Sequence, residues 1–278
     1  MIWTGHGFTL DLSKHVAVMG IVNVTPDSFS DGGRFSSTAQ AIEHALTLAA
    51  EGADILDIGG ESTRPGAEPV ALDEELKRVI PVIEEMRRHT TVPISIDTAK
   101  AEVARQALAA GANIVNDITA LSDPTMARVI ADTRPGLILM HMQGEPRTMQ
   151  QNPHYENLIE EVGAFLAAAA SRALAAGAAA ENIVIDPGIG FGKTWEHNLQ
   201  LIRETKRFTE LGYPVLIGPS RKRFIGELTG KEVDRRLYGS IGAVAAAVVL
   251  GARIVRVHDV APMIDAVRVA EAIVGMDK

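Results

Sequence analysis

The chain has 278 residues, a formal net charge of −8 and no cysteine, and 46% of its residues are hydrophobic although only 4% are aromatic. The lack of cysteine excludes disulfides, thiolate zinc sites and cysteine nucleophiles, and the acidic balance argues against a broad nucleic-acid-binding or anionic-membrane surface. The longest apolar run, residues 243–252, is shorter than the roughly 20 residues that cross a bilayer, and the first residues lack the pattern of a signal peptide, so we expect a cytoplasmic protein.

Short apolar runs alternate with longer segments of helical periodicity along the whole chain. A short hairpin is predicted near residues 3–10. Eight strands are predicted after it, over residues 16–23, 55–59, 94–97, 114–117, 137–140, 183–186, 215–218 and 254–258. A doubly wound open sheet usually has fewer strands and a Gly-rich first turn. We therefore expect an α/β fold, a (β/α)8 TIM barrel with a short N-terminal β-hairpin, formed by residues 1–278 as a single domain.

A Gly-Ala pair comes directly before three of the predicted strands, at Gly52, Gly111 and Gly251. Each glycine is predicted to close the preceding helix in the left-handed conformation, after which the chain enters the next strand. The same helix end before three strands supports a series of βα units.

A polar residue ends each of the eight predicted strands. These residues are Asn23, Asp57, Asp97, Asn116, His141, Asp186, Ser220 and His258. In a parallel barrel they would converge on one rim, although each alone could simply be a turn former. Three of them, Asp97, Asn116 and Asp186, together suit a flat heterocycle that offers ring N–H and amino groups. The alternative for Asp97 is a cap on the helix that follows it.

Basic residues gather near two of these strand ends. The Arg-Lys-Arg run at residues 221–223 is predicted at the start of a helix, where free N–H groups favour anions. Arg256 and His258 are two apart on one strand and should share a face. With Arg64 they predict a pocket for a phosphorylated substrate, and the alternative is a solvated basic surface.

Several familiar motifs are excluded. The Gly-rich run over residues 186–194 is not a P-loop, because Pro187 stands where that motif needs glycine, and its glycines more plausibly let the backbone approach a flat ligand. No zinc-binding H-E-x-x-H or G-x-S-x-G nucleophile motif is present. A Mg²⁺ carried on phosphates needs only one or two protein oxygens, and Asn23 could supply one.

Two long βα connections, VTPDSFSDGGRF after Asn23 and ESTRPGAEPVA after Gly60, are predicted on the same rim. They are rich in Gly, Pro, Ser and Asp, so they could order over a bound ligand or be ordinary surface loops.

These loops resemble the two signatures of the dihydropteroate synthase family, MGIVNVTPDSFSDGG at residues 19–33 and GGESTRPGA at residues 59–67. Agreement continues in SIDT, NDI, LMHMQG, DPGIGFGK, GPSRK and RVHDV, so the resemblance spans the chain; Pro219 in GPSRK is at a position that the family does not fix. The family is a TIM barrel that joins p-aminobenzoate to 6-hydroxymethyl-7,8-dihydropterin pyrophosphate in folate synthesis and releases pyrophosphate and 7,8-dihydropteroate. Sulfonamides compete as aminobenzoate mimics, and the family usually forms homodimers.

The resemblance implies a role for each matching residue. The residues implied to bind the pterin are Asp97, Asn116, Asp186, Lys222 and Arg256. Those implied to bind the pyrophosphate are Asn23, Thr63, Arg64, Arg256 and His258, with Asn23 acting as a metal ligand through Mg²⁺. Those implied to bind the aminobenzoate are Phe29, Thr63, Pro65, Phe191, Ser220 and Lys222. The residues implied to be catalytic are Asp97, Lys222, Arg256 and Arg64.

The resemblance also implies an SN1-like path, in which metal and cations stabilise the departing pyrophosphate and Asp97 stabilises the cationic pterin methyl carbon. The pterin would bind first, because the two loops close over it to create the aminobenzoate site. Asp57 is expected to do no more than position Arg64, and His141 to be a turn residue. The alternatives are a catalytically silent pterin-binding paralogue and a methyltetrahydrofolate-binding methyltransferase domain, which has no use for TPDSFSDGG or STRPG.

Overall fold

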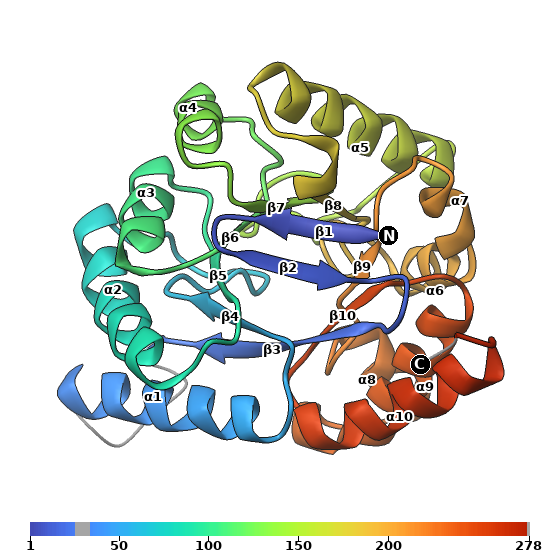
Figure 1. The fold of residues 1–278 in the computed structure, drawn as a ribbon. Helices are drawn as coiled ribbons and strands as arrows, with labels where there is room; N and C mark the ends of the chain where they lie inside the picture. The colour runs from blue at the N-terminus through green and yellow to red at the C-terminus, as the bar shows by residue number, and fades with distance from the viewer. Residues whose placement is uncertain (26–33, 277–278) are drawn as a thin grey trace.

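The structure, a computed structural model, describes residues 1–25 and 34–276. Within them, eight parallel strands form one sheet in the order β8-β7-β6-β5-β4-β3-β10-β9, and a bridge from Ile185 to Val215 closes it into a barrel (Figure 1). The strands are β3 (Ala17–Asn23), β4 (Ile55–Gly59), β5 (Ile94–Asp97), β6 (Ile114–Asp117), β7 (Gly136–Met140), β8 (Ile183–Asp186), β9 (Leu216–Ile217) and β10 (Ile254–Val257). The predicted barrel is confirmed, although β9 and β10 are shorter than predicted.

The helices surround the barrel on its outer side (Figure 1). They are α1 (Arg34–Ala50), α2 (Leu72–His89), α3 (Ala101–Ala110), α4 (Pro124–Thr133), α5 (Leu158–Ala175), α6 (Trp195–Arg203), α7 (Thr205–Thr209), α8 (Arg223–Thr229), α9 (Leu237–Val249) and α10 (Val260–Ile273), with short 3₁₀ turns η2 (Ala180–Asn182) and η3 (Val233–Arg235). Gly52, Gly111 and Gly251 have φ of 100°, 116° and 109°, so the predicted left-handed glycines are confirmed.

Alternate residues on each strand face opposite sides of the barrel wall. On β4, Leu56 and Ile58 belong to the large core between strands and helices, whereas Ile55 belongs to a separate core inside the barrel. That inner core is built from inward residues near the strand starts. Its buried strand residues are Ala17, Met19, Ile55, Ile114, Ile138, Val184, Leu216 and Ile254. The N-terminal end of the barrel interior is therefore apolar.

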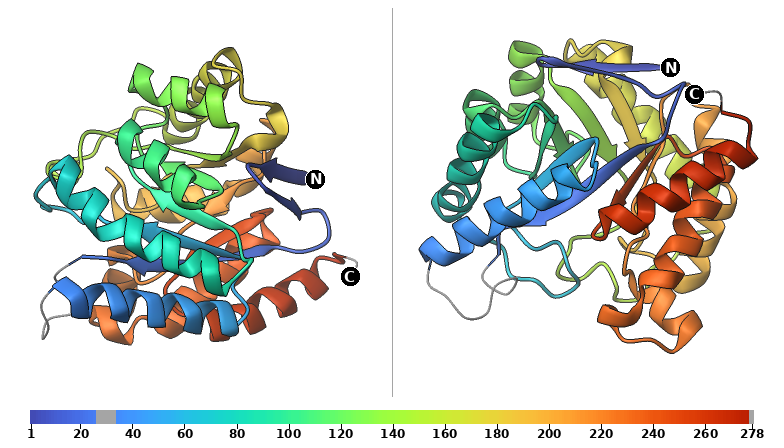
Figure 2. Two further views of the ribbon diagram at one scale, coloured as in Figure 1. Left: turned by 60° about the vertical axis from the view of Figure 1, so that its left-hand side comes forward. Right: turned by 60° about the horizontal axis from the view of Figure 1, so that its bottom comes forward.

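The predicted hairpin, β1 (Ile2–Gly5) and β2 (Phe8–Asp11), is confirmed and closes this end of the barrel. Trp3 is fully buried in the inner core, packs edge-to-face on Phe8 at 5.1 Å between ring centres, and donates from Nε1 to the carbonyl of Asn182 at 2.8 Å. Figure 2 shows the hairpin at one end of the barrel and the β4–α2 connection at the other. A ligand site inside the barrel mouth must therefore lie at the carboxyl ends of the strands.

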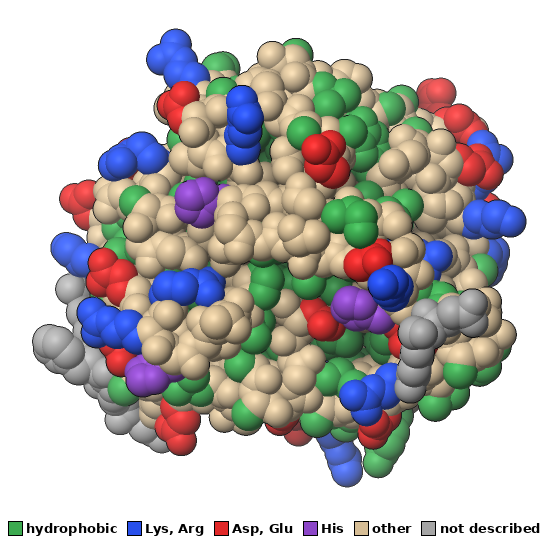
Figure 3. All heavy atoms as spheres, in the orientation of Figure 1, with side chains coloured by type: hydrophobic (Ala, Val, Ile, Leu, Met, Phe, Trp, Pro, Cys, Tyr) green, Lys and Arg blue, Asp and Glu red, His purple; other side chains and the backbone are tan. Residues whose placement is uncertain are grey.

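No helix in the described part of the chain is long and apolar enough to cross a membrane. On the face seen in Figure 3, which carries the hairpin, basic and acidic side chains are interspersed and lie mostly toward the periphery.

Candidate active site

Arg256 on β10 lies between two carboxylates at the barrel mouth. Its Nε donates to Oδ2 of Asp57 at 2.6 Å, and its Nη2 donates to Oδ2 of Asp97 at 2.7 Å. Asn116 adds a weaker hydrogen bond from Nδ2 to the same Asp57 oxygen at 3.3 Å. The side chain of Asp57 is fully buried, while those of Asp97 and Arg256 are 11% and 18% exposed. Strands β4, β5, β6 and β10 thus bring together four polar groups that face the interior, above the apolar inner core.

The expected role of Asp57 is wrong. It does not contact Arg64; its hydrogen-bond partners are Arg256 and Asn116. Asp57 pairs in register with Ser95 on β5, whereas Gly59 pairs with Asp97, so Asp57 lies one inward layer deeper than Asp97. At that depth its carboxylate binds the Arg256 guanidinium from the side of the inner core.

Burial shifts the protonation of the carboxyl groups at the mouth. It raises the pKa of Asp97 to about 7 against the lowering effect of Arg256, and the neighbouring Asp57 raises it further. Burial also raises the pKa of Asp186 to about 6, although the Gly188 N–H, which donates to its Oδ1 at 2.7 Å, opposes the shift. Burial acts to lower the pKa of Arg256, but Asp57 and Asp97 outweigh it and raise that pKa above its ordinary value. The mouth therefore combines a permanent cation with carboxyls that titrate near neutral pH.

Lys222, the N-cap residue of α8, is the second cation of the mouth. Its Nζ lies 4.2 Å from the ring centre of Phe191, and a Cβ added to Gly190 would approach its Cδ to 3.0 Å. Burial lowers the pKa of Lys222 to about 8, Arg256 lowers it further, and Asp186 and Asp97 oppose this. The ammonium is thus held between an aromatic face and the carboxylates.

The other two cations of the predicted basic run, Arg221 and Arg223, each pair with a carboxylate. Arg221 has a left-handed φ of 57° and donates from Nε to Asp259 at 3.0 Å, and Arg223 on the surface pairs with Glu227 at 2.8 Å. The charge of Arg221 is still near enough to lower the pKa of His258, but both arginines are engaged by carboxylates of their own.

Ser220 and His258 lie together at the ends of neighbouring strands. The Ser220 hydroxyl accepts from the His258 backbone N–H at 3.2 Å and lies 3.1 Å from its Nδ1. Burial lowers the pKa of His258 to about 3, and the charge of Arg256 acts in the same direction. In the absence of an anion this imidazole is therefore neutral, so it adds a hydrogen-bonding group to the predicted anion pocket without adding a charge.

The remaining predicted residues lie on the long loops or at their start. Thr63 is half-buried and Arg64 and Pro65 are exposed on the β4–α2 connection, and no hydrogen bond within the described residues holds the Arg64 guanidinium. Asn23, the last residue of β3, is half-buried, and its side-chain amide likewise has no hydrogen-bond partner in residues 1–25 and 34–276. Phe29 lies outside the described residues.

Two buried residues near the site were missed by sequence reasoning. His141, expected to be a turn residue, is 6% exposed and its Nδ1 lies 3.0 Å from Nζ of Lys193, which is 2% exposed. The one available signal was the lysine that ends the Gly-rich run, because lysine is rarely buried without a reason.

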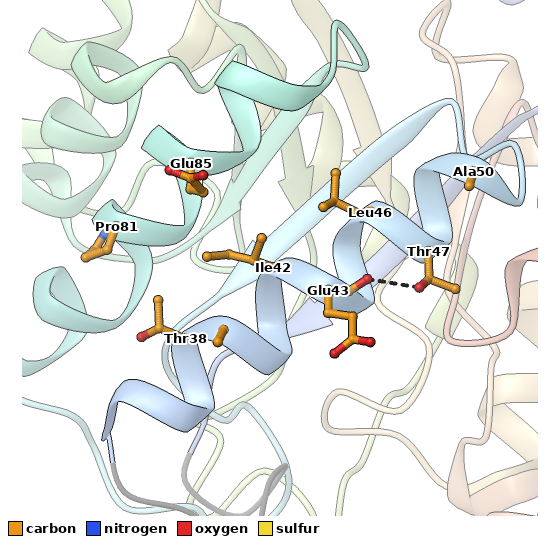
Figure 4. A pocket seen from close by; sticks show the side chains of 9 residues that line it. Thr38, Ile42, Glu43, Leu46, Thr47, Ala50, Pro81 and Glu85 are labelled. Atoms are coloured by element: carbon orange, nitrogen blue, oxygen red, sulfur yellow. Dashed lines mark hydrogen bonds between the residues drawn. The ribbon is translucent and has the colours of Figure 1, made fainter.

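Two surface grooves lie elsewhere. One, of about 710 Å³, lies between α1 and α2, and Figure 4 shows Ile42, Leu46 and Pro81 on its wall. The other, of about 430 Å³, lies between α6, α8 and α9. Neither is lined by the residues of the mouth.

Together these features define a TIM barrel with a largely buried cluster of charged and polar side chains at the carboxyl ends of its strands. The model of the family described as "Pterin binding enzyme" matches residues 19–258. The dihydropteroate synthase of Synechocystis sp. is 49% identical over 265 residues, which cover 95% of this chain and 92% of that protein. The chain belongs to the dihydropteroate synthase family, and the resemblance predicted from its motifs is confirmed.

Solved structures agree with this assignment. Yersinia pestis dihydropteroate synthase, in a sulfonamide drug complex, superposes with a TM-score of 0.93 at 43% identity and covers 98% of this chain and 99% of its own. The Xanthomonas albilineans enzyme with 4-aminobenzoic acid gives a TM-score of 0.90 at 50% identity and covers 95% of each chain.

Proposed function

We propose that this protein condenses 6-hydroxymethyl-7,8-dihydropterin pyrophosphate with p-aminobenzoate and releases 7,8-dihydropteroate and pyrophosphate. The observation that carries the proposal is the buried Arg256 cluster with Asp57 and Asp97 at the mouth of a barrel of this family. The ligand named for the Xanthomonas albilineans enzyme, 4-aminobenzoic acid, supports the second substrate.

The pterin would bind to side-chain donors and acceptors at the mouth that have no hydrogen-bond partner within the described residues. Asp186 uses Oδ1 for the Gly188 N–H and Asp97 uses Oδ2 for Arg256, so each keeps a carboxylate oxygen that can accept from a ring N–H or amino group. Asn116 donates one N–H to Asp57, and within the described residues its second N–H and its amide oxygen have no partner, so both can bind a ligand. Lys222 would donate to the pterin carbonyl, and the guanidinium of Arg256 would lie against the ring.

The pyrophosphate would lie toward Asn23, Thr63, Arg64, Arg256 and His258. The side-chain amide of Asn23 suits Mg²⁺, because its oxygen is a hard ligand and has no hydrogen-bond partner among residues 1–25 and 34–276, and a Mg²⁺ bound to phosphates needs only one or two protein oxygens. When bound, Mg²⁺ would offset the charge that grows on the departing pyrophosphate.

The proposed path is SN1-like. Arg64 and Arg256 would stabilise the leaving oxygens, while the ionised Asp97 would stabilise the cationic methyl carbon of the pterin. The aminobenzoate would then enter between Phe29, Pro65 and Phe191, with its carboxylate toward Ser220. No side chain needs to act as a nucleophile.

A product assay tests the function. Purified protein mixed with the pterin pyrophosphate, aminobenzoate and Mg²⁺ is expected to form dihydropteroate, and chelation of Mg²⁺ is expected to suppress this formation. Folded protein that binds the pterin without product would instead favour the silent paralogue. Methyl transfer from methyltetrahydrofolate, again without product, would favour the methyltransferase domain.

Lys222→Ala is expected to weaken binding of the pterin pyrophosphate by about tenfold or more, because a hydrogen bond to a charged group is lost in a buried site. The wild-type affinity should also fall above about pH 8, where the ammonium of Lys222 loses its proton. Calorimetric titration measures both. Arg223→Ala, which removes the neighbouring surface cation paired with Glu227, should leave the affinity unchanged. Unchanged affinity in Lys222→Ala would remove this residue from the pocket.

A homodimer through the Ala- and Val-rich helix at residues 241–250 is also proposed. Its support is the groove between α6, α8 and α9, which is lined in part by the exposed side chain of Leu228 (52% exposed), together with the exposed side chain of Tyr238 on α9 (85% exposed). The cytoplasmic location stays a prediction.

A further inference from the structure

The Gly-rich segment 188–192, between β8 and α6, lies directly against the backbone that follows β7. Gly188 and Gly192 have φ of 73° and 63°. A Cβ added to Gly188 would come within 1.9 Å of the His141 carbonyl oxygen, and one added to Gly192 within 2.4 Å of the Gln143 carbonyl oxygen. Glycine is thus required twice for the close approach of two backbones.

Side chains from the connection between β7 and α5 and from α6 form hydrogen bonds with the same segment. Gln150 donates from Nε2 to the Gly190 carbonyl at 2.6 Å, and the Tyr155 hydroxyl donates to the Gly192 carbonyl at 3.0 Å. The Gly190 N–H donates to Oδ1 of Asn198 at 2.6 Å. Both backbone polar groups of Gly190 and the carbonyl of Gly192 are therefore occupied within the protein, and these hydrogen bonds fix the position of the segment.

Lys193 is at the centre of this arrangement. Its Nζ donates to the Phe191 carbonyl at 2.9 Å, to the His141 carbonyl at 3.4 Å, and to Nδ1 of His141 at 3.0 Å. Burial lowers the pKa of His141 to about 3, so its Nδ1 is free to accept. Burial lowers the pKa of Lys193 to about 7, and the charge of Asp186 opposes this shift. No carboxylate forms an ion pair with the Lys193 amine in the described part of the chain, so hydrogen bonds, and not an ion pair, hold it in its buried position.

Phe191 connects Lys193 to the mouth. Its carbonyl is held by Lys193, and its ring, 8% exposed, lies under the ammonium of Lys222. A shift of the backbone at residue 191 would displace this ring.

We propose that Lys193 is a positioning residue for the aminobenzoate subsite: by tying the Phe191 carbonyl to His141, it holds the Phe191 ring as the wall against which the aromatic amine binds. The proposal rests on the proposed function. Lys193 touches neither substrate and acts only through Phe191.

The test is steady-state kinetics of Lys193→Met, which keeps the apolar stem and removes all three hydrogen bonds. We expect the KM for aminobenzoate to rise about tenfold while kcat and the KM for the pterin pyrophosphate change by less than about threefold, because the buried hydrogen bonds that fix one wall of the aminobenzoate subsite are lost. His141→Leu, which removes the acceptor, should reproduce this pattern. His141→Asn, whose side-chain oxygen can replace Nδ1, should restore most of the wild-type KM.

Asn182→Ala is the matched control for a purely structural role. It also removes three hydrogen bonds of a buried side chain, to the backbone of Thr4, the hydroxyl of Thr4 and the N–H of Ala179, at the hairpin end of the barrel. We expect both Asn182→Ala and Lys193→Met to lower the melting temperature. Asn182→Ala should, however, leave both KM values unchanged. An unchanged aminobenzoate KM in Lys193→Met, or an equal rise of both KM values, would overturn the proposal. Wild-type protein that forms no product would instead contradict the proposed function.

Discussion

Arg256→Ala is expected to lower kcat/KM by about 10²–10³-fold or more, since the guanidinium both faces the pterin and stabilises charge on the leaving group. The variant should also be less stable to unfolding by about 3–5 kcal/mol, because Asp57 and Asp97 are left as neighbouring buried carboxylates without their cation. Steady-state kinetics and urea unfolding measure the two effects separately.

A double variant separates the two consequences of this change. Adding Asp57→Asn to Arg256→Ala removes one of the two uncompensated carboxylates, so part of the lost stability should return. Turnover should not return, because the guanidinium is still absent. Near-normal kinetics in the single variant would show that Arg256 does not act at the reacting atoms, and stability that does not improve in the double variant would contradict the electrostatic explanation.

The pH dependence of kcat/KM is expected to have an acid limb with a midpoint near 7 that belongs to Asp97. Burial raises the pKa of this carboxyl to about 7, so the group is protonated below that pH and loses the negative charge that should stabilise the cationic pterin carbon. Activity should therefore fall as the pH drops through 7. Asp97→Asn should be slower by about 10²-fold at pH 8.

The shape of the profile distinguishes Asp97 from other groups. In Asp97→Asn the limb near 7 should disappear, and the remaining acid limb should follow Asp186, whose pKa burial raises to about 6. Ionisation of the substrate is common to both proteins, so the ratio of their rates at each pH isolates the contribution of the enzyme. A limb that stays near 7 in the variant would assign it to another group.

The location of the site follows from the sequence for a simple reason. All eight strands of the barrel run in parallel, so residues at their ends meet on one rim whatever their separation in the chain. Asp97 and Arg256 are 159 positions apart in the chain, yet Oδ2 of Asp97 lies 2.7 Å from Nη2 of Arg256. Period-2 alternation also predicts that Arg256 on β10 and His258, just after it, share one face without knowledge of any contact.

The depth of each residue in the barrel could not be predicted in this way. Depth depends on the stagger between neighbouring strands, which no single strand encodes. That stagger pairs Asp57 with Ser95 instead of Asp97, and so makes Asp57 a buried support for Arg256. The orientation of Arg221 and Arg223 was likewise decided by partners, Asp259 and Glu227, that only the folded chain brings near.

The sequence by itself determined the barrel, the hairpin, the rim and the family, because periodicity, glycine caps and motifs are local properties of the chain. Only the tertiary structure decided which of the rim residues share one electrostatic cluster. It also brought His141 to Lys193, 52 positions away, around the Gly-rich segment. Burial and pairing depend on the whole packed interior, so the protonation of Asp97, Asp186 and Lys222 and the fixed position of Phe191 are properties of the fold.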